Sequence, residues 1–508
     1  MTPGNQQPDH EVAVVGAGFS GIGAAIKVDE AGFHDLLLIE AGDGVGGAWH
    51  WNTYPGLAVD IPSFSYQFSF EKRTDWTRVY APGDELKAYA NHCVDRYGLR
   101  SRLRLNTTVT AASFDDEAHL WRLDVEGGEP ITARFVVGAT GVLTKPKPPD
   151  ILGLDDFEGE VMHTARWDHD LELGGQRVAI IGTGASALQV IPSIATQVEH
   201  LSVFQRTPIW CLPKPDGDLS PAMRRALRWV PGVKNVARGL SETYVELTFP
   251  LPAHFHGVVP LAKRGEAVAR KLLREQVHDP EIRDKLTPRY GLGCKRPGFS
   301  NDYLPTFNRD NVTLETTAID AITPEGVRTT DGVTHEIDVL ILATGFKVFE
   351  TGNMPPYPVR GTAGVDLEQW WDQNRFQAYE GVSVPGFPNL FAILGPYAFN
   401  GSSYFNLIEH QSRHIVRCLT RARSEGATRV EVRSEANDRY FRRMLGRRRN
   451  QIFFRGTCAE ANSYYFDRHG DVPFRASPTP EVAWRSARFD LDDYRFERPA
   501  PAPAAVAS

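Results

Sequence analysis

Cysteines are few in this sequence, and they lie far apart. The 508 residues include five of them, Cys93, Cys211, Cys294, Cys418 and Cys458. No two form the closely spaced pair that zinc sites and dithiol redox centres typically use. A disulfide framework, which stabilises small secreted domains, is uncommon in a chain of this size. We therefore expect no metal site, no disulfide framework and no disulfide redox chemistry.

Long apolar runs and a surplus of basic charge are absent as well. No run reaches the about 18 apolar residues that a membrane-spanning helix needs. The first ten residues, MTPGNQQPDH, lack the basic and apolar regions of a signal peptide. The formal net charge of −7 argues against a nucleic-acid-binding protein. We expect a cytoplasmic monomer or homodimer that spans no membrane and binds no nucleic acid.

The sequence does contain one nucleotide-binding pattern twice. Residues 11–16 (EVAVVG) are an apolar, β-branched run typical of a buried parallel strand, and 36–40 (LLLIE) form a second such run after a glycine-rich turn and a helix. The pattern returns at 177–206 as RVAII, GTGASALQVIPSIA and HLSVFQR. Two βαβ units predict an α/β chain with two doubly wound, Rossmann-like dinucleotide-binding domains.

The first unit carries the glycine fingerprint GAGFSG at 16–21. Gly16 permits a tight turn, Gly18 lets the backbone approach a pyrophosphate, and Gly21 lets the helix pack on the strand. Glu40 ends the next strand, where a carboxylate accepts hydrogen bonds from ribose hydroxyls but repels a 2′-phosphate. The alternative is a glycine-rich turn followed by a solvated glutamate. The pattern favours an FAD site formed by Gly16, Gly18, Phe19, Ser20, Gly21 and Glu40.

The second unit has the fingerprint GTGASA at 182–187, with alanine in the third glycine position. Glu40 lies 24 residues after Gly16, and Arg206 lies 24 residues after Gly182. A base therefore occupies the slot of the acid, and a guanidinium suits a 2′-phosphate through paired hydrogen bonds. The alternative is that Arg206 forms only a surface ion pair. The pattern favours an NADPH site formed by Gly182, Thr183, Gly184, Ala185, Ser186, Arg206 and Thr207.

Two such sites in one chain indicate a flavin that a nicotinamide cofactor reduces. The reduced flavin could then reduce a disulfide, a quinone or oxygen, although a disulfide reductase would need a redox cysteine pair. We expect one domain to be inserted in the other and to carry a helical insertion. The predicted parts are an FAD domain at 1–145 and 345–498, an NADPH domain at 146–344 with its insertion at about 215–290, and a disordered tail at 499–508.

The segment FEGEVMHTARWD at 157–168 narrows the chemistry. It resembles the fingerprint FxGxxxHxxxW, followed by Pro or Asp, of the type I Baeyer–Villiger monooxygenases. The matching residues are Phe157, Gly159, His163, Trp167 and Asp168. Because this segment crosses between the predicted domains, we interpret His163 as a hinge and hydrogen-bond anchor rather than a proton-transfer base.

The resemblance extends to a flavin-binding segment, GGAWHWNTYPG at 46–56, and to the nearby Asp60. The family often has Arg-Cys before this aspartate, where this chain has Ala58 and Val59. The resemblance adds five residues to the predicted FAD site, which are Gly47, Trp49, Asn52, Tyr54 and Asp60.

A further stretch, GCKRPGFSNDYLPTFNRDNV at 293–312, resembles the family's catalytic loop. The resemblance implies that Lys295 helps to hold NADPH and that Arg296 is the active-site arginine, oriented by Asp60. The alternative for these two cations is a solvated loop. Many family members have a tryptophan where this chain has Tyr464.

The family resemblance implies a complete reaction. NADPH would reduce FAD, the flavin would react with O2 to give a C4a-peroxyflavin beside Arg296, and a ketone would become an ester or lactone. The alternatives are a flavin monooxygenase that oxidises sulfur or nitrogen, and a binding protein without turnover. Five apolar residues are candidates for the substrate pocket or for the core, namely Trp210, Phe249, Tyr397, Phe399 and Tyr404.

Overall fold

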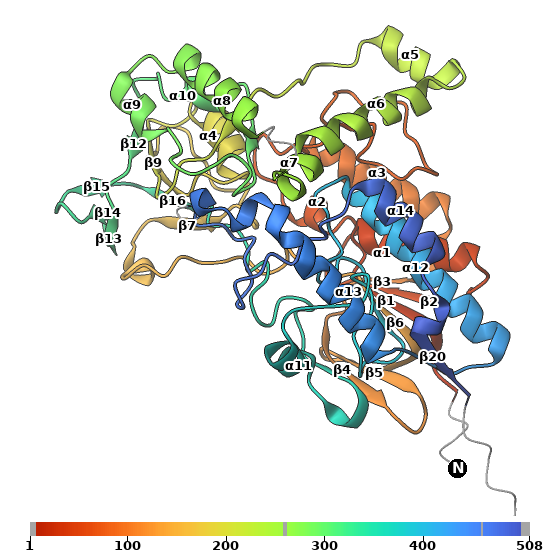
Figure 1. Ribbon diagram of the computed structural model, residues 1–508. Helices are drawn as coiled ribbons and strands as arrows, with labels where there is room; N and C mark the ends of the chain where they lie inside the picture. Colours follow the sequence, from red (N-terminus) through yellow and green to blue (C-terminus); the bar gives the residue numbers. More distant parts are fainter. Residues whose placement is uncertain (1–6, 258–261, 459–460, 499–508) are drawn as a thin grey trace, which may run out of the picture.

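Two large sheets form the frame of the molecule. The computed structural model describes residues 7–257, 262–458 and 461–498, and Figure 1 shows the arrangement. The first sheet has the order β17–β4–β5–β6–β1–β2–β3, and β18 pairs with β6. Its strands are β1 (His10–Val15), β2 (Leu36–Ile39), β3 (Leu103–Arg104), β4 (Val109–Asp115), β5 (Leu120–Val125), β6 (Ile131–Gly138), β17 (Val359–Arg360) and β18 (Leu390–Ala392).

The apolar run at 11–16 forms the centre of this sheet. Val12 pairs in parallel with Leu36 of β2 on one side and with Phe135 of β6 on the other. The side chains of Val12 and Val14 are fully buried. A strand with neighbours on both edges and cover on both faces needs such an unbroken apolar sequence.

The second sheet is parallel throughout and has the order β12–β9–β8–β16–β7. Its strands are β7 (Glu160–His163), β8 (Arg177–Ile181), β9 (His200–Phe204), β12 (Val312–Glu315) and β16 (Val339–Leu342). The strands predicted in the second nucleotide-binding unit are therefore present. Smaller sheets pair β10 (Cys211–Leu212) with β11 (Gly298–Phe299), join β13 (Ile319–Thr323), β14 (Gly326–Thr329) and β15 (Thr334–Glu336), and pair β19 (Arg429–Val432) with β20 (Tyr494–Glu497).

The distribution of strands confirms the predicted fold class of two Rossmann-like units, one inserted in the other. All five strands of the second sheet lie in sequence between β6 and β17 of the first. The boundaries predicted at 145/146 and 344/345 fall between strands of different sheets, and they stay a prediction. The tail predicted at 499–508 lies outside the described residues.

Helices cover both sheets and fill the predicted insertion. No helix of the described residues is long and apolar enough to cross a bilayer. The helices are α1 (Phe19–Glu30), α2 (Ala48–Trp51), α3 (Gly83–Arg96), α4 (Ala187–Ile194), α5 (Pro221–Trp229), α6 (Val233–Thr248), α7 (Pro250–His254), α8 (Ala262–Gln276), α9 (Pro280–Lys285), α10 (Tyr303–Thr306), α11 (Leu367–Asn374), α12 (Tyr404–Glu425), α13 (Ser434–Arg447) and α14 (Thr479–Arg488).

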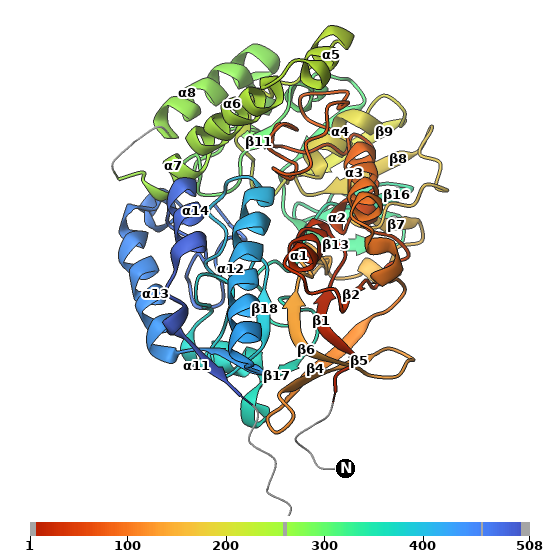
Figure 2. The same ribbon diagram turned by 90° about the vertical axis from the view of Figure 1, so that its right-hand side faces the viewer.

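The helical insertion lies next to the C-terminal helices, and Glu246 of α6 accepts a hydrogen bond from the Thr479 amide of α14 at 3.1 Å. Figure 2 shows α5, α6 and α8 together at the top, with α12, α13 and α14 below them. The helix α12 packs against α1 of the first nucleotide-binding unit and against α14. The C-terminal part of the chain thus packs on the sheet that β1 to β6 form, and it contributes β17 and β18 to that sheet.

The two fingerprint helices begin at different places. The helix α1 starts at Phe19, directly after Gly18, whereas α4 starts only at Ala187. A Cβ placed on Gly21 would lie 1.8 Å from the Gly16 carbonyl oxygen, so the first turn closes tightly only because Gly21 has no side chain. Ala187 carries a Cβ at the corresponding position, and the non-helical turn before α4 is two residues longer than the turn before α1.

The close approach of Gly21 to the Gly16 carbonyl predicts that adding one methyl group at position 21 destabilises the protein. Gly21→Ala should lower the free energy of unfolding by about 1–3 kcal/mol, because the added Cβ meets a backbone atom that cannot move freely. The matched control is Gly239→Ala in α6, where a Cβ meets nothing within 4 Å and alanine should stabilise the helix by about 0.5–1 kcal/mol. Urea unfolding of both variants checks this, and an equal effect in the two would contradict the packing argument.

Candidate active site

Glu40 holds the first glycine turn in shape. Its Oε2 accepts a hydrogen bond from the Ala17 amide at 2.7 Å, and its Oε1 accepts one from the Gly42 amide at 2.9 Å. The side chain is 6% exposed. A buried carboxylate at the end of β2 therefore fixes the loop that follows β1, which a solvated surface glutamate would not do.

The side chains of Phe19 and Ser20, two residues of the first fingerprint, contact other side chains of the protein rather than facing solvent. The ring of Phe19 is buried and lies against the rings of Phe68, Tyr89 and Phe405. The Ser20 hydroxyl lies 2.7 Å from the hydroxyl of Tyr404, at the start of α12. Only the backbone of Phe19 is therefore left to contact a ligand, and Tyr404 stands at the nucleotide-binding turn.

The segment 46–56 crosses directly over the first fingerprint. A Cβ placed on Gly47 would lie 2.9 Å from the Gly18 Cα, so the two backbones touch. The indole nitrogen of Trp49 donates to the Tyr66 hydroxyl at 3.2 Å, and the Asn52 amide donates to the Ala48 carbonyl at 2.8 Å. The predicted flavin-binding segment thus packs directly against the glycine turn of the first fingerprint.

Tyr54 connects the two nucleotide-binding units. It is buried, and its hydroxyl lies beside Ser186, the N-cap residue of α4. Burial raises the pKa of Tyr54 to about 12, although Ser186 opposes the shift. A second link joins the same regions, because the Ala58 amide donates to the Gln189 side chain at 2.7 Å. The two fingerprints therefore lie close enough for both segments to share contacts.

Asp60 and Arg296 form an ion pair across 236 residues of sequence. One oxygen, Oδ2, accepts from the Arg296 Nε at 2.7 Å and lies 2.6 Å from Nη2. Burial alone would lower the pKa of Arg296, but Asp60, Tyr465 and Tyr464 outweigh it, so the pKa lies above its ordinary value. The pair that the family resemblance implies is thus present, and its guanidinium stays charged at any ordinary pH.

Several residues that the sequence did not indicate surround this pair. Tyr66 and Lys214 both lie close to Asp60, and burial raises the pKa of Tyr66 while it lowers the pKa of Lys214. Tyr465 is 3% exposed and lies beside Arg296, next to the Tyr464 that replaces the family's tryptophan. No local motif marks these residues, because each comes from a different part of the chain.

A disulfide corrects one expectation from the sequence. Cys294 and Cys458 are bonded to each other, and both are buried. The bond joins the loop that carries Lys295 and Arg296 to the short turn that precedes Asn462. The sequence spacing of 164 residues gave no sign of this contact, because the C-terminal chain returns to the loop only in the folded molecule.

The predicted nicotinamide site gathers two cations. Burial lowers the pKa of Lys295, and the nearby Arg206 lowers it further. With the Asn462 amide oxygen facing Arg206, the Arg206 Nε donates to it at 2.9 Å. Neither cation has a carboxylate partner among the residues that the structure describes. The alternative interpretation of Arg206, a surface ion pair, therefore finds no support there.

The glycine turn beside these cations is open. Gly182 adopts a φ of +116°, and a Cβ on it would lie 2.5 Å from the Ala343 carbonyl oxygen. A Cβ on Gly184 would meet nothing within 4 Å. Thr183 donates to the Thr207 carbonyl at 3.1 Å and ties the turn to the Arg206 loop, while Ala185 is exposed. The turn thus presents free space and two positive charges together.

The 157–168 fingerprint includes β7, the edge strand of the second sheet, and the loop that follows it. His163 Nδ1 accepts from the Ala165 amide at 3.0 Å, and its Nε2 faces the Thr344 hydroxyl at 3.4 Å. Burial lowers the pKa of His163, and Arg166 lowers it further. A neutral, doubly engaged imidazole suits the predicted anchor better than a proton-transfer base.

The other fingerprint residues support this segment. A Cβ on Gly159 would lie 2.4 Å from the Asp338 carbonyl oxygen, and Phe157 packs on the apolar core beside β16. Trp167 packs against the core of the second unit, and Asp168 accepts from the Asp170 amide at 2.9 Å in an exposed turn. The guanidinium of Arg166 lies 4.1 Å from the ring centroid of Trp51, so the fingerprint contacts the predicted flavin-binding segment.

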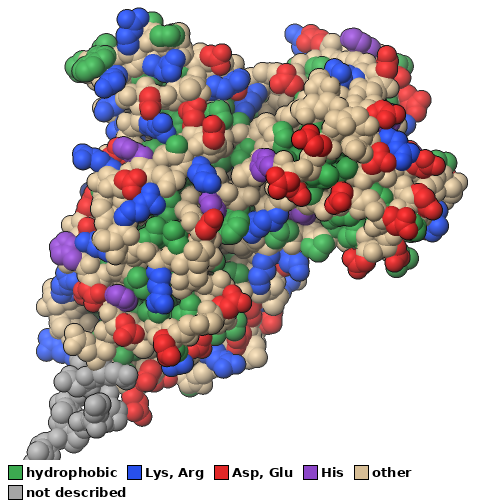
Figure 3. All heavy atoms as spheres, turned by 180° about the vertical axis from the view of Figure 1, so that it is seen from behind, with side chains coloured by type: hydrophobic (Ala, Val, Ile, Leu, Met, Phe, Trp, Pro, Cys, Tyr) green, Lys and Arg blue, Asp and Glu red, His purple; other side chains and the backbone are tan. Residues whose placement is uncertain are grey.

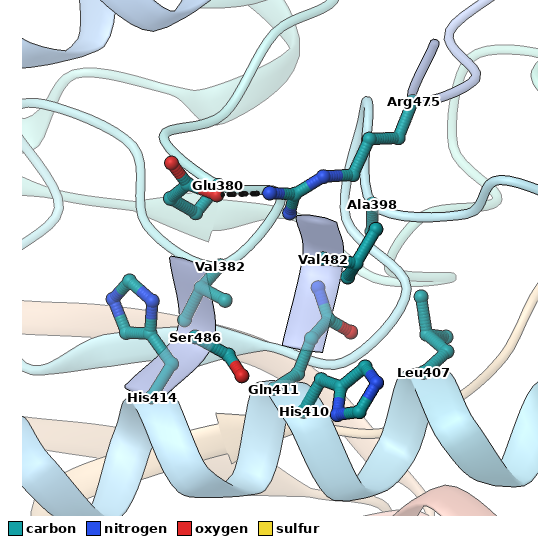
Figure 4. A pocket seen from close by; sticks show the side chains of 10 residues that line it. All are labelled: Glu380, Val382, Ala398, Leu407, His410, Gln411, His414, Arg475, Val482 and Ser486. Atoms are coloured by element: carbon teal, nitrogen blue, oxygen red, sulfur yellow. Dashed lines mark hydrogen bonds and ion pairs between the residues drawn. The ribbon is translucent and has the colours of Figure 1, made fainter. Parts of the chain in front are cut away.

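One enclosed cavity shares no residue with this site. Figure 4 shows it between α12 and α14, with the ion pair of Glu380 and Arg475 at 2.6 Å and two histidines on its wall. Burial lowers the pKa of His410 to about 4 and that of His414 to about 3. The cavity has room for about one water molecule, so it is too small to hold a substrate.

A family model and a curated relative match this chain. The model for pyridine nucleotide-disulphide oxidoreductases covers residues 13–237, a range that contains neither cysteine of the disulfide. A Baeyer-Villiger monooxygenase from Streptomyces coelicolor is 37% identical over 511 residues, which covers 99% of this chain and 96% of that protein. The match therefore extends far beyond a single nucleotide-binding motif.

Solved structures match over the same length. OTEMO in complex with FAD and NADP has a TM-score of 0.83 and 29% identity, and covers 97% of this chain and 100% of its own. A cyclohexanone monooxygenase from Rhodococcus sp. Phi1 bound to NADP+ has a TM-score of 0.86 and 29% identity over 97% and 100%. With two facing nucleotide-binding units, a full-length relative and full-length structural matches, this chain belongs to the Baeyer–Villiger monooxygenases.

Proposed function

We propose that this protein uses FAD and NADPH to insert one oxygen atom of O2 beside the carbonyl of a ketone, giving an ester or lactone. The observation that carries the proposal is the ion pair of Asp60 and Arg296 between two facing dinucleotide-binding units. When bound, the flavin supplies hydride acceptance from NADPH and activation of O2. The residues of this chain supply binding, orientation and a fixed positive charge.

The first unit fits a flavin dinucleotide. The backbones of Gly18 and Gly47 touch each other, and neither glycine has a side chain that would block a pyrophosphate from the amide donors at the start of α1. Glu40 stabilises this loop through Ala17 and Gly42 and retains lone pairs for ribose hydroxyls. A carboxylate at this place disfavours a 2′-phosphate, which suits FAD.

The second unit fits NADPH. Gly184 faces open space at the start of the unit, and Arg206 and Lys295 lie together without a carboxylate partner in the described chain. Two adjacent cations repel each other until an anion lies between them, and a 2′-phosphate supplies that anion. Asn462 orients Arg206 through its amide oxygen, so the C-terminal segment also belongs to this site.

Arg296 is proposed to stabilise negative charge during oxygen transfer. Its Nε and Nη2 face Asp60, so the remaining Nη1 can point toward a reacting oxygen. Its raised pKa keeps it from giving up a proton, so it stabilises an anion without protonating it. Asp60 fixes the orientation of the guanidinium, and the side chains of Tyr66 and Tyr465 lie beside the pair.

The residues of the 157–168 fingerprint are proposed to link the two nucleotide-binding units, because they contact residues of both. His163 anchors the end of β7 to Thr344, at the end of β16. Arg166 and His169 contact Trp51 and Thr53 of the flavin-binding segment. Movement of one domain against the other would therefore act on residues 51–54, which gives the fingerprint a positioning role.

Arg206 should decide cofactor choice. Arg206→Ala should raise the KM for NADPH at least about tenfold and leave the KM for NADH nearly unchanged, since one charge-assisted contact is worth about 1.5–3 kcal/mol. Arg309→Ala, an exposed arginine of the same domain, serves as the control. Steady-state kinetics with both nucleotides test this. Equal use of NADH by the unaltered protein would refute the assignment.

Arg296 should be needed for oxygen transfer but not for flavin binding. Arg296→Ala should retain FAD and lower ester formation at least about 100-fold, as loss of a charge-stabilising donor typically does. NADPH consumption should then appear as hydrogen peroxide. The matched control is Arg289→Ala, whose side chain is 79% exposed. Measuring NADPH, peroxide and ester together tests the role, and an unchanged ester yield would remove Arg296 from the reaction.

The disulfide should position the loop that carries Lys295 and Arg296. Cys294→Ser and Cys458→Ser should each raise the KM for NADPH several-fold and increase uncoupled NADPH consumption, and a phosphine reductant should do the same to the unaltered protein only. Cys418→Ser, a buried free cysteine, is the control. Alkylation of the denatured protein should modify three cysteines before reduction and five after it. Kinetics that no cysteine variant alters would contradict this role.

A further inference from the structure

The helices α5 and α6 expose an unusual amount of apolar surface. Six of the fourteen large hydrophobic residues that are exposed in the described chain fall between 223 and 247. They are Met223 (48% exposed), Trp229 (72%), Val230 (50%), Val236 (63%), Leu240 (69%) and Leu247 (50%). Scattered exposed hydrophobic residues need no explanation, but six within 25 residues of sequence concentrate apolar surface on α5, α6 and the turn between them, which we call the patch.

The geometry of α6 separates this patch from the body of the protein. Val236, Leu240 and Leu247 are four and seven residues apart and therefore share one face of the helix. The opposite face is buried and anchored. There Arg238 donates to the Gln67 carbonyl at 2.8 Å, and the Ser241 and Ser65 hydroxyls lie 2.7 Å apart. The helix is thus held firmly to the protein with its apolar face turned outward.

The patch also lies in a positively charged stretch of an acidic protein. Residues 219–241 contain five cations and no acid, although the whole chain has a net charge of −7. The nearest acids on α6 are engaged elsewhere, since Glu242 pairs with Arg238 at 2.8 Å and Glu246 accepts from Thr479. Four of the cations, Arg224, Arg225, Arg228 and Lys234, lie outside the anchored inner face, whereas the fifth, Arg238, is buried there.

The surface view agrees with these residues. Figure 3 shows hydrophobic and basic side chains next to each other at the upper left, the position of α5 in that view, with few acidic side chains among them. Figure 1 shows α5 at the outer end of the insertion, away from both sheets. The exposed apolar side chains of α5 and α6 therefore lie at one end of the molecule, where a planar partner could reach them.

We propose that the outer face of α5 and α6 docks on an anionic lipid surface. Exposed aliphatic side chains and a tryptophan would enter the interface between headgroups and acyl chains, and the arginines would lie among the headgroups. A second copy of this chain is a poorer partner, because a symmetric contact would bring the same cations together. No described helix can span a bilayer, so the contact is a surface attachment. The proposal does not depend on the enzymatic reaction.

The test uses the full chain with its flavin and sucrose-loaded vesicles. The protein should sediment with vesicles of phosphatidylcholine mixed with phosphatidylglycerol, and not with pure phosphatidylcholine. Binding should weaken as salt rises, because ions screen the arginines. Trp229→Ser with Leu240→Ser should weaken binding at least about tenfold, since two large apolar groups no longer leave water. Arg225→Glu with Arg228→Glu should abolish it.

Matched controls separate the patch from general effects. Leu152→Ser with Trp484→Ser removes two exposed apolar residues elsewhere, which are 78% and 55% exposed. Arg442→Glu with Arg495→Glu makes the same change of net charge on the exposed surface of α13 and β20. Both controls should bind as the unaltered protein does. Retained flavin and an unchanged thermal midpoint show that each variant is folded.

Three results would overturn the proposal. The first is no sedimentation with anionic vesicles. The second is sedimentation that the patch variants leave unchanged. The third is a concentration-dependent dimer in sedimentation velocity that the Trp229 and Leu240 substitutions dissociate, with no vesicle binding, which would assign the face to a second copy of the chain.

Discussion

The ion pair of Asp60 and Arg296 is the contact on which the candidate active site depends. Asp60 follows the flavin-binding segment, and Arg296 lies on a loop between the helical insertion and the last strands of the second sheet. The guanidinium is charged at any ordinary pH, and the carboxylate beside it offsets the cost of burying that charge and fixes its orientation. In the proposed reaction this fixed charge acts between the two cofactors. The two nucleotide-binding units must therefore face each other for either residue to function.

The C-terminal segment supplies the third wall of this site. Cys458 bonds to Cys294, Asn462 contacts Arg206, and Tyr465 lies beside Arg296. These contacts tie residues near the end of the chain to the proposed NADPH site rather than to the sheet of their own domain. A movement of this segment would therefore break contacts of the proposed NADPH site.

One face of α6 in the helical insertion is held to the rest of the protein, and the opposite face is exposed to solvent. The inner face of α6 forms hydrogen bonds to Gln67, Ser65 and Asn406, close to the flavin-binding half. Its outer face leaves aliphatic side chains in water, which lowers solubility unless a partner covers them. Since the inner contacts fix the helix in place, the outer face stays presented whether or not a partner is bound.

The sequence by itself determined the two βαβ units, the opposite charges of Glu40 and Arg206, and the family. These features depend on neighbouring residues, whose apolar periodicity and glycine spacing act locally. Only the tertiary structure decided that Phe19 packs in the core, that α4 begins at Ala187, and that Cys294 meets Cys458. Such contacts join loops that are distant in sequence, and their proximity depends on how two whole domains and the C-terminal segment pack together, which no local pattern encodes.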